Sequence, residues 1–233
     1  MFKNTPVISL IPARGGSKGI PLKNLALVLG KPMIFHTLKA SRLSKIFDKT
    51  YISTDNNKII KYLEQFDVNI IKRPKNISKD KSSASSVVSH FLKKIDIKTL
   101  KKNPYIVYLQ PTSPLRDEHH IDKAFRKMKK YNSEGLVSIA ELSYTPFKTF
   151  TITKDNRLKS IFDEKKTNFG RQDLPMAYKS NGAIYIFRAK SFLRNKSFPS
   201  NGSLPYLMNN LDSTDIDTMQ DLRNLNKVIK KWK

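Results

Sequence analysis

The chain has 233 residues, with 44 lysines and arginines against 19 aspartates and glutamates, which gives a formal net charge of +25. This length allows one sizeable core but not two comfortable domains, and the lack of cysteine excludes a disulfide framework or a thiolate zinc site. The basic residues are spread along the whole chain rather than gathered into one arm, so we interpret most of them as solvated surface and expect no specific nucleic-acid partner.

Short apolar strands alternate with amphipathic helices through the first 140 or so residues. We predict strands at 7–13, 50–53, 68–72, 105–110 and 136–140, and helices at 33–44, 57–66, 85–97 and 119–130. This alternation predicts an α/β fold with a largely parallel sheet, covered by helices on both faces. In such folds ligands bind at the carboxyl ends of the strands.

The alternation breaks between about residues 141 and 178. Two short strands are predicted there, at 149–153 and 158–162. The sheet pattern resumes at 183–187, and a last helix is predicted from Met219 to Trp232. We therefore expect a single domain over residues 1–233, with a small lobe inserted at approximately 141–178.

A glycine-rich, cationic loop follows the first predicted strand. Glycines without Cβ atoms let backbone N–H groups approach phosphate oxygens, while Arg14, Lys18 and Lys23 supply positive charge. The loop has neither the Gly-Lys-Ser/Thr ending of a Walker A motif nor the Gly-x-Gly-x-x-Gly order of a dinucleotide fold. It predicts a site for a nucleoside triphosphate, in which Ser17 would donate a hydrogen bond to phosphate.

Asp215 and Asp217 form a second candidate functional element. Carboxylates two residues apart in an extended segment project to the same side. Such a pair can hold Mg²⁺, which takes oxygen ligands and keeps waters and substrate phosphates as its others. Asp217 or Thr218 could instead cap the last helix, but the triphosphate-type loop favours the metal interpretation.

Two further segments carry groups suited to a polar ligand. Residues 110–116 leave a strand through a proline-rich turn, and residues 171–175 place an arginine ahead of Asn181. Because a guanidinium can bind a carboxylate in bidentate fashion, Arg171 suggests an acidic sugar or another acid, although a surface Arg171–Asp173 pair is the alternative. The four histidines are scattered, without a metal-site spacing, and we assign them no chemistry.

Taken together, these motifs resemble those of the acylneuraminate cytidylyltransferases, also called CMP-sialic acid synthetases. The matching segments are 11–24, 53–55, 110–116, 171–175, 181–185 and 215–221, so the resemblance covers nearly the full chain. It implies a Rossmann-like, three-layer nucleotidyltransferase fold whose insertion serves dimerisation. It also implies that the anomeric hydroxyl of a nonulosonic acid (sialic, legionaminic or pseudaminic acid) attacks the α-phosphate of CTP and releases pyrophosphate.

The resemblance also implies roles for individual residues. Four are candidate catalytic residues: Arg14 and Lys23 on the phosphates, and Asp215 and Asp217 on Mg²⁺. The expected nucleotide-binding residues are Ala13, Arg14, Gly15, Gly16, Ser17, Lys23, Asn24, Ser82, Ser83 and Ser85, with the serine that contacts the base unassigned. The expected sugar-binding residues are Gln110, Lys148, Arg171, Tyr178 and Asn181. Lys148 matches a lysine that reaches into the partner's site of a homodimer.

The same sequence also leaves alternative functions open and bears on the cellular location of the protein. A transferase for KDO or another sugar is the nearest alternative, and a basic nucleic-acid-binding protein is the alternative from a different class. No apolar run approaches the roughly 20 residues that span a bilayer, so no membrane partner is expected. Because the first residues lack the regions of an export signal, we expect a cytoplasmic protein.

Overall fold

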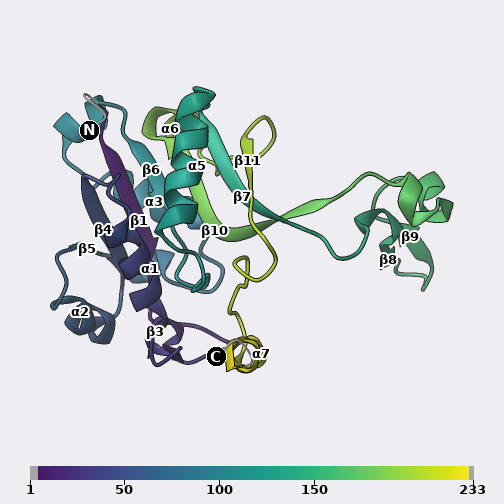
Figure 1. Ribbon diagram of the computed structural model, residues 1–233, viewed down its shortest axis with the longest axis horizontal. Helices are drawn as coiled ribbons and strands as arrows, with labels where there is room; N and C mark the ends of the chain where they lie inside the picture. Colours follow the sequence, from purple (N-terminus) through teal and green to yellow (C-terminus); the bar gives the residue numbers. More distant parts are fainter. Residues whose placement is uncertain (1–4, 231–233) are drawn as a thin grey trace.

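The computed structural model describes residues 5–230 and is built on a seven-stranded sheet. The strand order is β11-β7-β10-β6-β1-β4-β5, and only β10 runs antiparallel to its neighbours (Figure 1). The bounds are β1 Val7–Pro12, β4 Lys49–Thr54, β5 Asn69–Lys72, β6 Tyr105–Tyr108, β7 Gly135–Glu141, β10 Tyr178–Arg188 and β11 Leu204–Leu207. The predicted α/β fold with a mostly parallel sheet is confirmed.

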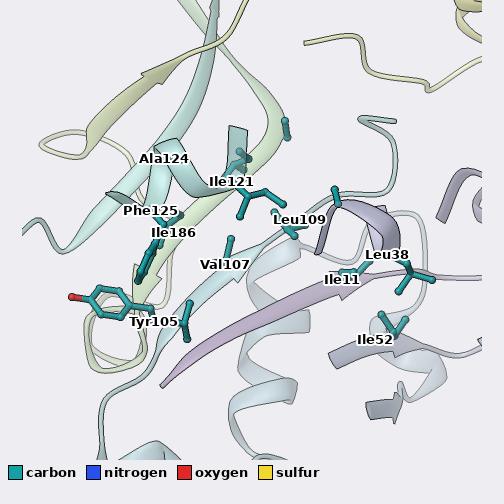
Figure 2. Packing of buried hydrophobic residues seen from close by; sticks show 14 of the residues in the cluster. Ile11, Leu38, Ile52, Tyr105, Val107, Leu109, Ile121, Ala124, Phe125 and Ile186 are labelled. Carbon is teal, nitrogen blue, oxygen red and sulfur yellow. The ribbon is translucent and has the colours of Figure 1, made fainter. Parts of the chain in front are cut away.

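Helices cover both faces of this sheet. One face is covered by α1 (Met33–Leu43), α2 (Asn57–Leu63) and α5 (Glu118–Lys130), and the other by α3 (Ala84–Leu92), α4 (Ile97–Lys101) and α6 (Ala189–Asn195). The central strands β1 and β6 are apolar on both faces because both are buried, as is typical of parallel sheets. Figure 2 shows the larger core, where Val107 of β6 and Phe125 of α5 belong to one cluster.

The last helix, α7 (Met219–Lys230), packs on a small separate cluster. Its Leu222 and Leu225 pack with Val28 of the hairpin β2 (Leu27–Val28) and β3 (Lys31–Pro32), and with Ile216. This packing holds the segment before α7 beside the loop that follows β1. Of the predicted final helix, Trp232 lies outside the described residues.

Several elements differ from the sequence-based predictions. Strand β10 begins at Tyr178, five residues before its predicted start, and α6 and β11 were not predicted. The helix predicted at 85–97 corresponds to α3 and ends earlier, at Leu92, and the short helix α4 that follows was not predicted. Asp96 starts α4 by accepting a hydrogen bond from the Thr99 N–H. Residue patterns alone do not show such short breaks.

The segment between β7 and β10 leaves the body of the molecule, and we call residues 142–177 the arm (Figure 1). Its centre is an antiparallel pair, β8 (Phe150–Ile152) and β9 (Leu158–Ser160), flanked by short 3₁₀ turns. The side chains of Ile152 and Leu158 lie opposite each other and are each 71% exposed. A small element with so much exposed apolar surface is typical of an interaction surface.

Within residues 5–230, no helix combines the length and the apolar character that crossing a membrane requires.

Candidate active site

A cavity of about 380 Å³ lies at the carboxyl ends of the parallel strands β1, β5 and β6. This is the position at which open α/β sheets bind their ligands, and the volume suits a small molecule. Segments from five parts of the chain line it: Pro12, Arg14, Gly16, Ser17, Lys23, Asn24, Arg73, Asp80, Ser82, Ala84, Val87, Tyr108, Gln110, Pro111, Thr112, Asp215 and Asp217.

The backbone of the glycine loop is held in place by hydrogen bonds to the neighbouring protein. The Ala13 N–H donates to the Ser53 carbonyl at 2.8 Å, and the Gly15 N–H donates to Asp55 Oδ1 at 2.9 Å. Asn24 Nδ2 donates to the Arg14 carbonyl at 2.9 Å. Ala13 and Gly15 are therefore buried supports of the loop and are absent from the cavity lining, which the loop supplies through Arg14 and other residues.

The glycine loop and the acidic segment 215–217 are in direct contact. Lys23 Nζ lies 2.7 Å from Asp217 Oδ1, although the two residues are 194 positions apart in the chain. The backbones also meet, because a Cβ added at Gly19 would overlap the carbonyl oxygen of Asp217. Cations and carboxylates of the two predicted motifs thus face one cavity.

The acidic segment is also bonded to the turn after β6. The Ile216 N–H donates to the Thr112 carbonyl at 2.8 Å, and the Thr112 hydroxyl hydrogen-bonds to the Asp215 carboxyl. On the far side of this turn the fully buried Arg116 donates to Thr37 Oγ1 at 2.6 Å, and burial lowers the pKa of its guanidinium to about 9. The turn is therefore fixed between α1 and the acidic segment.

The helix cap that could have explained Asp217 is made by other residues. The Asp221 carboxylate accepts from the Thr218 N–H at 2.7 Å, and the Asp221 N–H donates back to Thr218 Oγ1 at 3.2 Å. These reciprocal bonds form a capping box at the start of α7. The side chain of Asp217 is left to face the cavity and Lys23.

The pKa of the Asp215 carboxyl is raised above its ordinary value. The residue is exposed, yet the protein packed around its carboxyl raises the carboxyl pKa by desolvation, and the neighbouring Asp217 and Asp221 raise it further. The Thr112 hydrogen bond and the charge of Lys23 oppose this rise. Asp215 therefore holds its proton to a higher pH than an ordinary aspartate.

Two charged residues of the cavity were not predicted from the sequence. Arg73, directly after β5, is 5% exposed and donates from Nη2 to the Ser53 carbonyl at 2.7 Å. Asp80 pairs with Arg14, with 2.8 Å between Nη1 and Oδ1. A charged residue directly after a predicted strand was the available signal for Arg73, whereas Asp80 lies in a lysine-rich loop without a distinguishing pattern.

His120, to which the sequence assigned no chemistry, joins α5 to the acidic segment. Its Nδ1 lies 2.6 Å from Asp117 Oδ1, and its Nε2 lies 3.2 Å from Asp212 Oδ2. Asp212 in turn lies three residues before Asp215. The imidazole thus ties the start of α5 to the segment that carries the cavity carboxylates.

Ser82, Ser83 and Ser85, the candidates for contact with the base, occupy different positions. Ser82 lines the cavity, and its hydroxyl accepts a hydrogen bond from the Lys79 N–H at 3.0 Å. Ser83 caps α3 by accepting from the Ser86 N–H at 3.2 Å, and neither Ser83 nor Ser85 is part of the lining. Of these three serines, Ser82 is the one that lines the cavity.

The five expected sugar-binding residues are separated in the structure. Gln110 lines the cavity, whereas Lys148 and Arg171 are exposed on the arm and Tyr178 is exposed where the arm joins β10. The Arg171 guanidinium donates to the Ser143 carbonyl at 2.8 Å. Within a single chain, only Gln110 of this set faces the cavity.

Asn181 is 4% exposed and uses its amide within the protein. Its Oδ1 accepts from the Ser138 hydroxyl at 2.5 Å, and its Nδ2 donates to Ser213 Oγ at 2.9 Å. The network joins β7, the irregular part of β10 and the segment leading to Asp215. In this chain Asn181 supports the site from behind.

Comparison with known proteins agrees with this geometry. The sequence profile of the family described as "Cytidylyltransferase" matches residues 8–231. The chain is 33% identical over 217 residues to the pseudaminic acid cytidylyltransferase of Campylobacter jejuni, with 92% of each chain covered. It is 32% identical over 221 residues to the CMP-N,N'-diacetyllegionaminic acid synthase of Legionella pneumophila, again covering 92% of both.

A longer relative and a solved structure complete the comparison. The chain is 34% identical over 216 residues to the N-acylneuraminate cytidylyltransferase of Streptococcus agalactiae, covering 92% of this chain but only 51% of that protein, so it spans about half the length of such relatives. A structure of CMP:2-keto-3-deoxy-manno-octonic acid synthetase complexed with CTP aligns with a TM-score of 0.71 over 98% of this chain, at 16% identity. At that identity the likeness concerns the fold.

The buried amide of Asn181 predicts a loss of stability on its removal. Asn181→Ala leaves the Ser138 and Ser213 hydroxyls without their partner, which should lower the free energy of unfolding by about 1–3 kcal/mol. Urea denaturation measures the change, and Asn76→Ala, at an exposed position, should change it by less than about 0.5 kcal/mol. Equal stability of the parent and Asn181→Ala would contradict the supporting role.

Proposed function

Because the chain belongs to the cytidylyltransferase family, we propose that it transfers CMP from CTP to the anomeric hydroxyl of a nonulosonic acid and releases pyrophosphate. The relatives named for pseudaminic, legionaminic and N-acylneuraminic acids support this substrate class. The observation that carries the proposal is the contact between Lys23 and Asp217. It joins a phosphate-type loop and a carboxylate pair at one cavity, where a triphosphate needs both.

The cavity residues suit a divalent cation. Asp215 and Asp217 supply hard oxygen donors, and no cluster of three or more metal-binding side chains occurs within residues 5–230. A pair of carboxylates is what Mg²⁺ uses when phosphate oxygens and waters complete its ligands. We therefore propose that Asp215 and Asp217 hold Mg²⁺, which when bound would offset the negative charge of the triphosphate.

The cations of the cavity would act on the phosphates of CTP. Arg14 and Lys23 flank the glycine loop, and Arg73 adds a buried positive charge at the end of β5. Charges that are held in position before the reaction need no reorganisation as negative charge develops, and they are commonly the largest catalytic contribution. The backbone of Gly16 and the hydroxyls of Ser17 and Ser82 would also contact the nucleotide.

Removal of the hydroxyl proton from the sugar requires a base. Asp215 is a candidate where Asp217 alone holds the cation, because in the metal-free protein the raised pKa of Asp215 makes its carboxylate a better proton acceptor than that of an ordinary aspartate. The Thr112 hydroxyl orients the carboxyl through its hydrogen bond. Gln110, on the same turn, would contact the sugar acid.

The exposed arm supports the proposal that the protein is a homodimer. Its exposed apolar side chains form a surface that a second copy could bury, and Lys148 lies on it, outside the cavity of its own chain. We propose that the arm, inserted into a single nucleotidyltransferase domain, brings Lys148 to the sugar side of the partner's site. Arg171 and Tyr178, on and beside the arm, would bind the sugar acid near the same place.

The cytoplasmic location expected from the sequence is part of this proposal, because CTP is an intracellular nucleotide and the chain contains no cysteine that would need an oxidising compartment.

The reaction predicts release of pyrophosphate from CTP in the presence of Mg²⁺ and an acidic sugar. N-acetylneuraminic, legionaminic and pseudaminic acids should be compared side by side with KDO, and at least one of the first three should be turned over. Lys23→Ala should lower kcat by about 10²-fold or more through loss of a positioned charge, whereas Lys61→Ala, on the outer surface of α2, should not. Turnover with none of the four acids would contradict the proposal, and turnover with KDO alone would contradict the substrate class.

The raised pKa of Asp215 predicts a shifted pH dependence. If ionised Asp215 is needed, kcat/KM falls as the pH drops through its pKa, and this occurs at a higher pH than for an ordinary aspartate. Asp215→Asn should remove this acid limb together with most of the activity. Full activity with an unaltered pH–rate profile in Asp215→Asn would exclude Asp215 from the mechanism.

The exposed arm predicts a dimer that charged substitutions dissociate. The double variant Ile152→Asp/Leu158→Asp places two carboxylates on one face of the β8–β9 pair, and light scattering after gel filtration should then report a monomer. Leu193→Asp, at an exposed position on α6, should leave the dimer intact. A parent protein that is monomeric at micromolar concentration would contradict the dimer.

A further inference from the structure

Asp80 is an acidic side chain placed among the cations of the phosphate site. Its Oδ1 lies 2.8 Å from Arg14 Nη1, and its Oδ2 lies 3.8 Å from Lys18 Nζ. It belongs to the cavity lining and comes from the turn before α3, which is far from the acidic segment in the sequence. The proposed reaction gives it no part.

Arg14 and Lys23, the two cations proposed to bind phosphate, are each paired with a carboxylate. Lys23 is paired with Asp217, and Arg14 with Asp80. The two pairs differ in their setting: Asp217 belongs to the carboxylate pair proposed to hold Mg²⁺, whereas Asp80 belongs to the cavity lining but not to that pair. If phosphate takes Arg14, the carboxylate of Asp80 exchanges its 2.8 Å partner for the looser contact with Lys18, at 3.8 Å.

We propose that Asp80 is an internal competitor for Arg14, which weakens the binding of the pyrophosphate portion of CTP and of the pyrophosphate product. This rests on the proposed function, in which Arg14 binds phosphate. Two anions on one guanidinium repel each other, and the repulsion grows with the charge of the ligand. The effect is therefore larger for pyrophosphate and CTP than for CMP, which lacks the outer phosphates.

Because the pair is exposed to solvent, phosphate can displace Asp80 from Arg14. The side chains of Arg14 and Asp80 are 32% and 39% exposed, so water screens their attraction and the pair opens at low cost. A fully buried pair would instead block the site. Asp80 thus lowers the affinity for the outgoing pyrophosphate without closing the cavity to CTP.

The opposite role would give the opposite result, which makes the proposal testable. If Asp80 served to orient Arg14 towards phosphate, its removal would weaken the binding of pyrophosphate. If it competes, its removal strengthens that binding. The probe is pyrophosphate itself, because it binds without turnover of the sugar substrate.

The experiment is calorimetric titration of the full chain with pyrophosphate, CTP and CMP, in Mg²⁺ at constant pH and ionic strength. Asp80→Asn should bind pyrophosphate about three- to fivefold more tightly than the parent, the change expected for an exposed ion pair, with CMP binding unchanged. The inhibition constant of pyrophosphate in the turnover assay should fall by the same factor.

Matched variants separate this effect from a change in net charge. Asp67→Asn carries the same charge change at the exposed turn before β5, at the end of the strand away from Arg73, and should bind pyrophosphate as the parent does. In an Arg14→Gln background, Asp80→Asn should have no further effect on binding. Thermal denaturation checks that each variant is folded, and Asp80→Ser serves if Asp80→Asn is not.

The outcomes are distinguishable from failure of the proposed function. A parent protein that binds neither CTP nor pyrophosphate overturns the proposed function. A parent that binds both, together with an Asp80→Asn variant that binds pyrophosphate equally or more weakly, overturns the competitor role alone. Equal tightening of CMP and pyrophosphate also overturns it, because the effect would then be a general one of charge.

Discussion

The contact between the glycine loop and the acidic segment is the constraint on which the rest of this structure depends. An ammonium group near the start of the chain and a carboxylate near its end lie 2.7 Å apart, at Lys23 and Asp217. Gly19 allows the two backbones to approach where any Cβ would collide. Without this approach the cations and the carboxylates would be two unrelated surface features rather than the two sides of one cavity.

The fold supplies this contact in a small number of steps. The buried strands β1 and β6 direct the loop and the proline-rich turn to one edge of the sheet. The acidic segment is then fixed to that edge by the backbone bond from Ile216 to Thr112, by His120 through Asp212, and by the packing of α7. Apolar packing thus places the polar groups, and short hydrogen bonds set their orientation.

The elements with a strong local pattern could be predicted from the sequence, and those set by distant contacts could not. A short apolar run is enough to predict β1, and cations with glycines after a strand are enough to predict the phosphate-type loop. The burial of Asn181 could not be predicted, because it depends on Ser138 and Ser213, which topology brings from elsewhere. The place of Asp80 in the cavity likewise follows from the path of a loop, since the lysines on either side of it are exposed.

The most direct test of the account is a crystal structure of the protein with CTP and Mn²⁺, used for its anomalous signal in place of Mg²⁺. The account predicts the triphosphate between Arg14 and Lys23, and an anomalous peak within coordinating distance of Asp215 and Asp217. A nucleotide bound outside this cavity, or a metal peak remote from both aspartates, would contradict it.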